Sequence, residues 1–282
     1  YVDEGYRYAF TNGIRVYTTP TAGASDISGN TVAGIKVGNG TNNSGITKAI
    51  ALSLDTLNYS TVNNNTIEGF VLAHPGYANF RGIEVTAGLV QIGVGGANTI
   101  GNINNPIISS GTYNTPNVPN IVGINILPPV WNGKAPKGGS RIENNTIAGF
   151  VTAGATLLVG IEAISTGNIG TPGNISVQNN TVRDVFMTGS AANQFVGIRS
   201  HTAIGTSYNT ANTINTSVIA DFGSITGNII GDPSNAASIV CPGPITGISV
   251  ASTVGGSKIH KNTISGLQST ATSFTGVQML LP

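Results

Sequence analysis

The chain has 282 residues, of which 39 are glycine and only 8% are charged, and its formal net charge at pH 7 is +1. Its twelve lysines and arginines are scattered, which argues against nucleic-acid binding, and no run of about eighteen apolar residues predicts a membrane span. The single cysteine, Cys241, excludes an intrachain disulfide. Abundant Gly, Asn, Thr, Ile and Val favour short β-strands and tight turns over amphipathic helices.

A phrase of nine residues recurs along the chain. Its clearest copies are VNNNTIEGF at 62–70, IENNTIAGF at 142–150, VQNNTVRDV at 177–185 and IHKNTISGL at 259–267. We take Asn145, the second asparagine of the copy at 142–150, as a marker. The equivalent positions are Asn30, Asn65, Pro106, Asn145, Asn180, Asn228 and Asn262, which are 34 to 48 residues apart. Periods of this length are typical of solenoids and other repeat folds.

Isoleucine or valine stands three residues before and two residues after every marker. The first column is Ile27, Val62, Ile103, Ile142, Val177, Ile225 and Ile259, and the second is Val32, Ile67, Ile108, Ile147, Val182, Ile230 and Ile264. Such columns predict side chains that face a common core. Because the two columns are an odd five residues apart, a corner must lie between them. Asparagine suits that corner, since it tolerates the left-handed conformation.

A second phrase, of the type Gly-Ile-x-Val, follows each marker and also precedes the first one. It reads GIRV at 13–16, AIAL at 49–52, GIEV at 82–85, GINI at 123–126, GIEA at 160–163, GIRS at 197–200, GISV at 247–250 and GVQM at 276–279. Its second residue forms a third inward column, Ile14, Ile50, Ile83, Ile124, Ile161, Ile198, Ile248 and Val277. The next residue faces outward, in the row Arg15, Ala51, Glu84, Asn125, Glu162, Arg199, Ser249 and Gln278.

Short strands that recur once per repeat bury their apolar faces only when they stack. The sequence therefore predicts an all-β fold with little or no helix, a right-handed parallel β-helix of about seven coils and roughly 30 to 35 Å in length. We expect residues 1–282 to form a single segment, excised from a longer solenoid because both ends fall at the same point of the coil. Residues 1–12 are expected to form a partial N-terminal cap. The segments 109–120, 130–139 and 205–218 are predicted loops.

The two phrases together, I-x-N-N-T-I-x-G-F followed by G-I-x-V, resemble the repeat of the pectin-lyase-like superfamily, which includes large secreted bacterial surface proteins. The resemblance extends from about residue 13 to residue 279. It implies the parallel β-helix but no single activity, because the superfamily contains lyases, hydrolases, phage tailspikes, adhesins and inert stalks.

Two outward glutamates, Glu84 and Glu162, are the candidate catalytic pair. They stand two coils apart with Asn125 between them, roughly 9 to 10 Å by coil spacing, near the upper limit for an inverting glycosidase. Arg199 lies one coil beyond Glu162, so an ion pair between neighbouring strands is the simpler interpretation. Motifs such as NTD and GHG, which polygalacturonases would show, are absent. We therefore expect that the protein is not an enzyme. If it is an enzyme, we expect a polysaccharide lyase or a glycoside hydrolase.

Other candidate ligands are few. His74, His201 and His260 fall at different points of the coil, so no metal site is predicted. No cofactor is expected; Asp232 with Asn235 is the one candidate for Ca²⁺, although the same residues suit an ordinary turn. The marker asparagines Asn30, Asn65, Asn145, Asn180, Asn228 and Asn262 are expected to form a structural ladder in which stacked amides bond to one another.

The expected function is that of a non-enzymatic rigid stalk, filament or adhesin segment of a secreted or cell-surface bacterial protein. The alternative is a carbohydrate-active enzyme or glycan-binding tailspike-like module that holds a polysaccharide between Glu84, Glu162 and Trp131, the only tryptophan. Expected partners are neighbouring β-helix coils, copies of the chain, surface polysaccharide or other cell-surface proteins, without nucleic acid.

Overall fold

The computed structural model describes residues 10–18, 23–37, 45–55, 58–73, 78–110, 120–127, 139–154, 156–165, 173–202, 218–222, 226–251, 258–270 and 273–280. These residues form 29 β-strands and no helix, so no helix among them is available to cross a membrane. All strands belong to four sheets, and within each sheet every strand pairs in parallel with its equivalent one repeat later. The prediction of an all-β parallel solenoid is confirmed.

The longest strands build the first sheet, which we call sheet A. It consists of β1 (Phe10–Tyr17), β5 (Gly45–Ser53), β9 (Ala78–Ala87), β13 (Ile121–Ile126), β17 (Leu157–Ser165), β21 (Gln194–Thr202), β25 (Ile245–Ala251) and β29 (Phe274–Leu280). Sheet B consists of β2 (Asp26–Ser28), β6 (Tyr59–Asn63), β10 (Leu89–Ile92), β14 (Ser140–Glu143), β18 (Gly173–Gln178), β22 (Val218–Phe222) and β26 (Lys258–Ile259).

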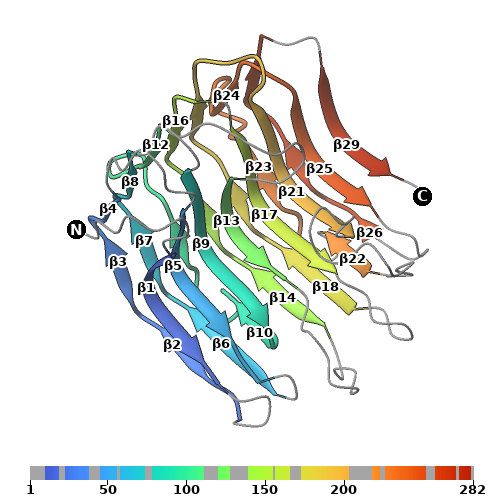
Figure 1. The fold of residues 1–282 in the computed structure, drawn as a ribbon. Coiled ribbons are helices and arrows are strands. Elements are labelled where there is room, and N and C mark those ends of the chain that lie inside the picture. Colours follow the sequence, from blue (N-terminus) through green and yellow to red (C-terminus); the bar gives the residue numbers. More distant parts are fainter. Residues whose placement is uncertain are drawn as a thin grey trace, which may run out of the picture.

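Two sheets of shorter strands close the coil. Sheet C consists of β3 (Thr31–Ala33), β7 (Thr66–Glu68), β11 (Thr99–Ile100), β15 (Thr146–Ile147), β19 (Thr181–Val182), β23 (Ile229–Ile230) and β27 (Thr263–Ile264). Sheet D consists of β4 (Lys36–Val37), β8 (Val71–Leu72), β12 (Ile107–Ser109), β16 (Phe150–Thr152), β20 (Val185–Met187), β24 (Ile239–Cys241) and β28 (Leu267–Ser269). A coil runs through sheets B, C, D and A, so coil 1 is β2–β5 and coil 7 is β26–β29. The coils follow one another along a rod, with β1 at one end of sheet A and β29 at the other (Figure 1).

One hydrophobic core runs along the inside of the rod. The third inward column predicted from the sequence is in register throughout sheet A, and Ile50, Ile83, Ile124, Ile161 and Ile198 are fully buried. Aromatic rings fill the remaining space: Phe80 packs edge-on against Phe70 and Phe150, with ring centroids 5.1 and 6.3 Å apart. Burial is lower at the last coil, where Val277 is half exposed.

The third repeat was placed wrongly from the sequence. Its marker is Asn98, not Pro106, and the inward residues are Ile92 and Ile100. The residues predicted for these columns, Ile103 and Ile108, are 56% and 39% exposed. Asn98 stands six positions after Ile92, whereas Asn145 stands only three positions after Ile142, so a fixed spacing selected the wrong residues.

The sixth coil has the same longer corner. Phe222 pairs with Val177 on one side and with Ile259 on the other, and it lies six residues before Asn228. The predicted inward residue at this point, Ile225, lies outside the described residues. Corner length therefore varies between coils, while the register of the strands does not.

Close backbone approach explains the glycine of the Gly-Ile-x-Val phrase. A Cβ added at Gly123 would lie 2.6 Å from the carbonyl oxygen of Gly160 in the next coil and 2.7 Å from Cγ2 of Ile147. The same conflict recurs at Gly82, Gly160, Gly197 and Gly247. Sheet A thus lies directly against the β-branched column of sheet C, and a methyl group would force the two apart.

Left-handed residues form the corner between sheets B and C. The residue before the marker has a positive φ at Asn64, Asn144, Asn179 and Lys261, with values of 53° to 60°. Asparagine adopts this conformation more readily than most residues, so the prediction for the Asn-Asn corner is confirmed for its first asparagine.

The predicted loops and cap lie largely outside the described residues. Of the segments 109–120, 130–139 and 205–218, Ser109 and Val218 belong to β12 and β22, while 111–119, 130–138 and 205–217 are not described. Of the expected cap at 1–12, residues 10–12 begin β1 and pair with β5, and residues 1–9 lie outside the described part of the chain.

Candidate functional site

The marker asparagines form a continuous hydrogen-bonded ladder at the corner between sheets B and C. Each side-chain Nδ2 donates to Oδ1 of the asparagine in the next coil. The donor–acceptor distances are 2.9 Å for Asn30–Asn65, 2.9 Å for Asn65–Asn98, 2.8 Å for Asn98–Asn145, 2.9 Å for Asn145–Asn180, 3.0 Å for Asn180–Asn228 and 2.8 Å for Asn228–Asn262. The ladder predicted for six of these residues is present, and Asn98 completes it.

The ladder also holds the main chain. Nδ2 of Asn145 donates to the carbonyl oxygens of Ile92, 3.1 Å away, and Glu143, 2.9 Å away, and its backbone N–H donates to Oδ1 of Asn180 at 3.0 Å. Asn65, Asn98, Asn145, Asn180 and Asn228 are buried. Their amides are engaged by the protein itself, so the ladder is architecture and not a ligand site.

The outward row of sheet A has the predicted register. Glu84 pairs with Asn125, Asn125 with Glu162, and Glu162 with Arg199. These residues point away from the core, yet Glu84 is only 4% exposed, Asn125 3% and Glu162 1%. The sequence pattern correctly predicts that these residues point outward, but it does not predict that they are buried.

Both glutamates of this row form ion pairs with a neighbouring coil. Oε2 of Glu84 contacts the Lys48 ammonium, and Oε1 of Glu162 contacts the Arg199 guanidinium, whose Nε lies 3.0 Å away. The simpler interpretation of Glu162 and Arg199 as an ion pair is therefore confirmed. Asn125 still separates the two carboxylates by one coil, so they are not adjacent in the row.

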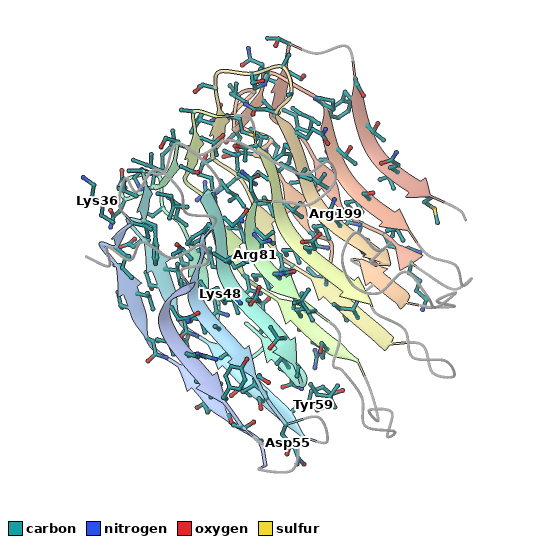
Figure 2. The ribbon with its side chains drawn as sticks, in the orientation of Figure 1. Lys36, Lys48, Asp55, Tyr59, Arg81 and Arg199 are labelled. Carbon is teal, nitrogen blue, oxygen red and sulfur yellow. The ribbon has the colours of Figure 1, made fainter. Side chains whose placement is uncertain are left out.

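Arg81 adds a buried cation on the same face, where Lys48 and Arg199 are partly buried. Its Nη1 donates to the carbonyl oxygens of Phe80 at 2.9 Å and Asn120 at 3.1 Å. Burial lowers the pKa of Arg81, the carboxylates of Glu162 and Glu84 raise it, and Arg199 lowers it. Arginine stays protonated in proteins, so Lys48, Arg81 and Arg199 place three cations beside the two carboxylates. Figure 2 shows Lys48, Arg81 and Arg199 distributed along the sheet.

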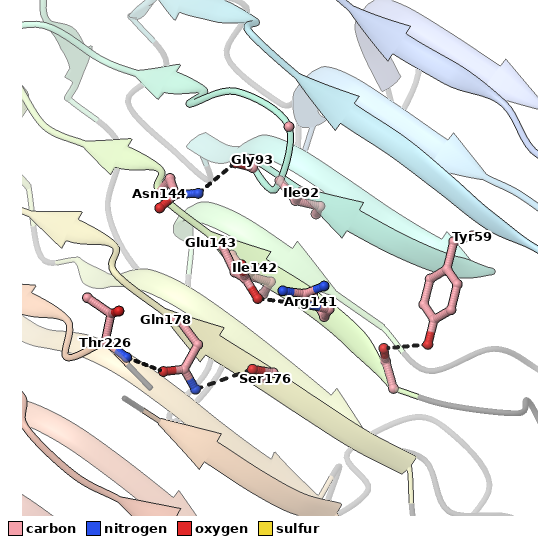
Figure 3. Close-up of polar contacts among 12 residues, drawn as sticks. Tyr59, Ile92, Gly93, Arg141, Ile142, Glu143, Asn144, Ser176, Gln178 and Thr226 are labelled. Carbon is pink, nitrogen blue, oxygen red and sulfur yellow. Dashed lines mark hydrogen bonds and ion pairs between the residues drawn. The ribbon is translucent and has the colours of Figure 1, made fainter. Parts of the chain in front are cut away.

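A second polar surface lies on the outside of sheet B (Figure 3). Nε of Arg141 lies 2.7 Å from Oε1 of Glu143, and Nε2 of Gln178 donates to Oγ of Ser176 at 3.3 Å. The Tyr59 hydroxyl donates to the carbonyl oxygen of Gly139 at 3.1 Å. These polar groups are paired within the same strand or with a nearby coil.

The candidate Ca²⁺ residues form a turn. Oδ1 of Asp232 accepts bonds from the backbone N–H of Ser234 at 2.8 Å and from its hydroxyl at 2.7 Å, and these bonds lower the pKa of Asp232. Asn235 closes the turn through its N–H, which donates to the carbonyl oxygen of Asp232 at 3.1 Å. Among the described residues, no three His, Cys, Asp or Glu side chains gather as metal ligands would.

The remaining candidate residues are dispersed. Trp131 and His74 lie outside the described residues, His201 belongs to β21, and His260 is exposed beside the corner of coil 7. Cys241 is buried and free, and burial raises the pKa of its thiol to about 11. It behaves as the small buried hydrophobe expected from the sequence.

No protein-family model, no curated protein and no solved structure matches this chain. The geometry of the coils is therefore the basis on which a function can be inferred.

Proposed function

We propose that the chain is a rigid, non-enzymatic rod within a secreted or cell-surface bacterial protein, where it serves as a stalk, filament or adhesin segment. The observation that carries this proposal is the state of the two candidate glutamates. Each is almost completely buried and held in an ion pair with a neighbouring coil. A catalytic carboxyl group must instead reach the substrate and exchange protons with it.

Rigidity has its own support. Parallel ladders connect every coil to the next in all four sheets, and the asparagine ladder adds a fifth line of hydrogen bonds along the rod. Each coil contacts its neighbours on both sides, so bending the rod would break several ladders at once.

The structural relationship to the pectin-lyase-like superfamily is part of this proposal. Its support is the parallel stacking of four-sheet coils with an asparagine ladder, together with the repeated phrase of the sequence. The placement at the cell surface rests on the resemblance of that phrase to repeats of large secreted bacterial surface proteins. Surface labelling of intact cells with an antibody against the chain tests it, and labelling only after lysis would contradict it.

The decisive experiment is a depolymerisation assay with acidic and neutral polysaccharides, run on the unchanged chain and on Glu84→Gln and Glu162→Gln. We expect no turnover by any of the three. Circular dichroism first establishes that both variants remain folded. Turnover that either substitution abolishes in a folded protein would overturn the proposal.

A glycan array addresses the alternative of a glycan-binding module. If the rod does not bind glycans, no glycan on the array retains it. Reproducible binding to one class of glycan, lost in Trp131→Ala, would favour the alternative instead.

A further inference from the structure

The outer face of sheet D carries an uninterrupted apolar stripe. One residue from each of five successive coils lies in register on this face, and these residues are Val71, Ile108, Val151, Phe186 and Val240. Ile108 is exposed and the other four are partly exposed. Ile103, at the corner that leads into β12, adds a second exposed isoleucine beside the stripe. Contiguous apolar surface of this kind marks interaction sites.

Charged residues near sheet D alternate in sign along the rod. Lys36 begins β4 in coil 1, Glu68 ends β7 in coil 2, Arg183 follows β19 in coil 5, and Asp232 follows β23 in coil 6. Among the charged side chains that are not buried, the signs along the rod are therefore plus, minus, two uncharged coils, plus, minus; Asp184, next to Arg183 in coil 5, is buried. Lys36 projects from the rod at its first coil (Figure 2).

Arg183 has two acidic neighbours within its own chain. Its Nε lies 3.5 Å from Oδ2 of the buried Asp184, and its Nη1 lies 4.0 Å from Oδ2 of Asp232, at the outer limit of an ion pair. The Arg183 side chain is nevertheless 44% exposed and that of Asp232 26%. Arg183 and Asp232 therefore both have exposed surface from which they can reach a charge on a partner.

The order of charges along one rod is complementary to the order along a second rod that runs in the opposite direction. If a second rod lies antiparallel across sheet D, with a two-fold axis between coils 3 and 4, then coil 1 faces coil 6 and coil 2 faces coil 5. Lys36 stands in the row of the stripe, next to Val71, so it then lies over Val240 of the second copy, in the coil that carries Asp232 at its corner. Glu68 meets Arg183, which holds the equivalent position of sheet C. Each contact occurs twice. The same arrangement sets Val71 against Phe186 and Ile108 against Val151. An interface between two identical chains requires this self-complementarity.

We propose that the sheet D face binds a second copy of this chain, forming an antiparallel two-fold dimer in which the apolar stripes pack together and the opposite charges meet along their sheet C side. The stripe is narrow, so the dimer belongs to the small, reversible class of interfaces and its population depends on protein concentration. These charges set the register of the two rods, because shifting one rod by one coil would remove the opposite-charge contacts. This inference goes beyond the proposed rod function and does not depend on it.

The test is sedimentation velocity of the full chain over a range of concentrations at low salt. The unchanged chain is expected to shift from monomer to dimer as its concentration rises. Phe186→Glu places a charge in the stripe and is expected to weaken association at least tenfold. Lys258→Glu, an exposed charge reversal on sheet B, is the matched control and is expected to leave association unchanged.

A pair of charge-reversed chains tests the register directly. One chain carries K36E and E68K, and the other carries R183E and D232K. Each alone meets like charges in a two-fold dimer and is expected to associate at least tenfold more weakly, whereas their equimolar mixture restores all four opposite pairs and forms a heterodimer. Circular dichroism confirms folding of each chain. A monomer at every concentration, or a mixture no stronger than its components, would overturn the proposal.

Discussion

Glu162 and Arg199 occupy the same outward position on neighbouring coils, and Nε of Arg199 lies 3.0 Å from Oε1 of Glu162. The pair joins β17 to β21 on a face where Glu162 is only 1% exposed. The Arg199 side chain is 12% exposed, so removing Glu162 would leave a largely buried charge without its compensation, which is costly.

The first prediction concerns this pair. Glu162→Gln is expected to lower the free energy of unfolding by about 3 kcal/mol, since the Arg199 guanidinium would keep its burial and lose its carboxylate. Urea unfolding followed by circular dichroism measures the change. The control is Glu143→Gln, which breaks the more exposed pair with Arg141 and is expected to cost at most about 1 kcal/mol. Equal losses for the two variants would contradict the prediction.

The asparagine ladder leads to the second prediction. Asn145→Ala removes an amide that donates to Ile92, Glu143 and Asn180 and accepts from Asn98, so buried polar groups on both neighbouring coils lose a partner. We expect a loss of about 3 kcal/mol. Asn30→Ala, at the first coil, removes bonds to Ser28 and Asn65 from a partly exposed position and is expected to cost less than half as much. Thermal unfolding of both variants compares them, and an equal effect would show that burial of the ladder is not what matters.

The inward columns could be predicted from the sequence because core packing allows only a few residue types at those positions. Ile50, Ile83 and Ile124 repeat in the same phrase, and the structure places all three in one column. Corner length has no such restriction, since an extra residue at a corner points to solvent. This freedom is why Asn98 was missed in favour of Pro106. The triplet Asn98-Thr99-Ile100, which repeats the Asn-Thr-Ile of the other copies, is the signal that identifies the correct marker.

The candidate site was predicted only in part, for a related reason. Glu162 and Arg199 share one position of the repeat, so aligning the copies was enough to pair them. Lys48 stands three residues before Ala51 in its own copy, at the position of Arg81 in the next, and its contact with Glu84 is therefore diagonal. Aligned rows do not reveal diagonal contacts. The burial of the outward row of sheet A depends on the rest of the fold, so it could not be predicted from the residues of the row themselves.

The third prediction uses the glycine column as its own control. Gly123→Ala is expected to destabilise the protein by about 2 to 4 kcal/mol, because its Cβ would press on Gly160 and Ile147. Gly276 occupies the same column in the last coil, where nothing lies within 4 Å of an added Cβ, so Gly276→Ala is expected to be neutral or to stabilise by up to about 1 kcal/mol. Chemical denaturation measures both. If Gly276→Ala were as harmful as Gly123→Ala, the close approach between sheets A and C would not be the reason for the glycines.

The fourth prediction is a slow, pH-dependent reaction of Cys241. Burial raises the pKa of its thiol from 9.0 to about 11, so at pH 8 only about one molecule in a thousand carries the reactive thiolate. Alkylation of the folded protein is therefore expected to be far slower than in urea and to accelerate as pH rises towards 11. Because the folded-state pKa is the higher one, this thiol's contribution to stability is complete below pH 9 and is lost as pH rises through 11. Cys241→Val lacks that contribution, so unfolding of the two proteins compared from pH 8 to pH 11 isolates it. Fast alkylation of the folded chain at pH 8, or identical pH dependence with and without the thiol, would contradict the burial of Cys241 on the inner face of sheet D.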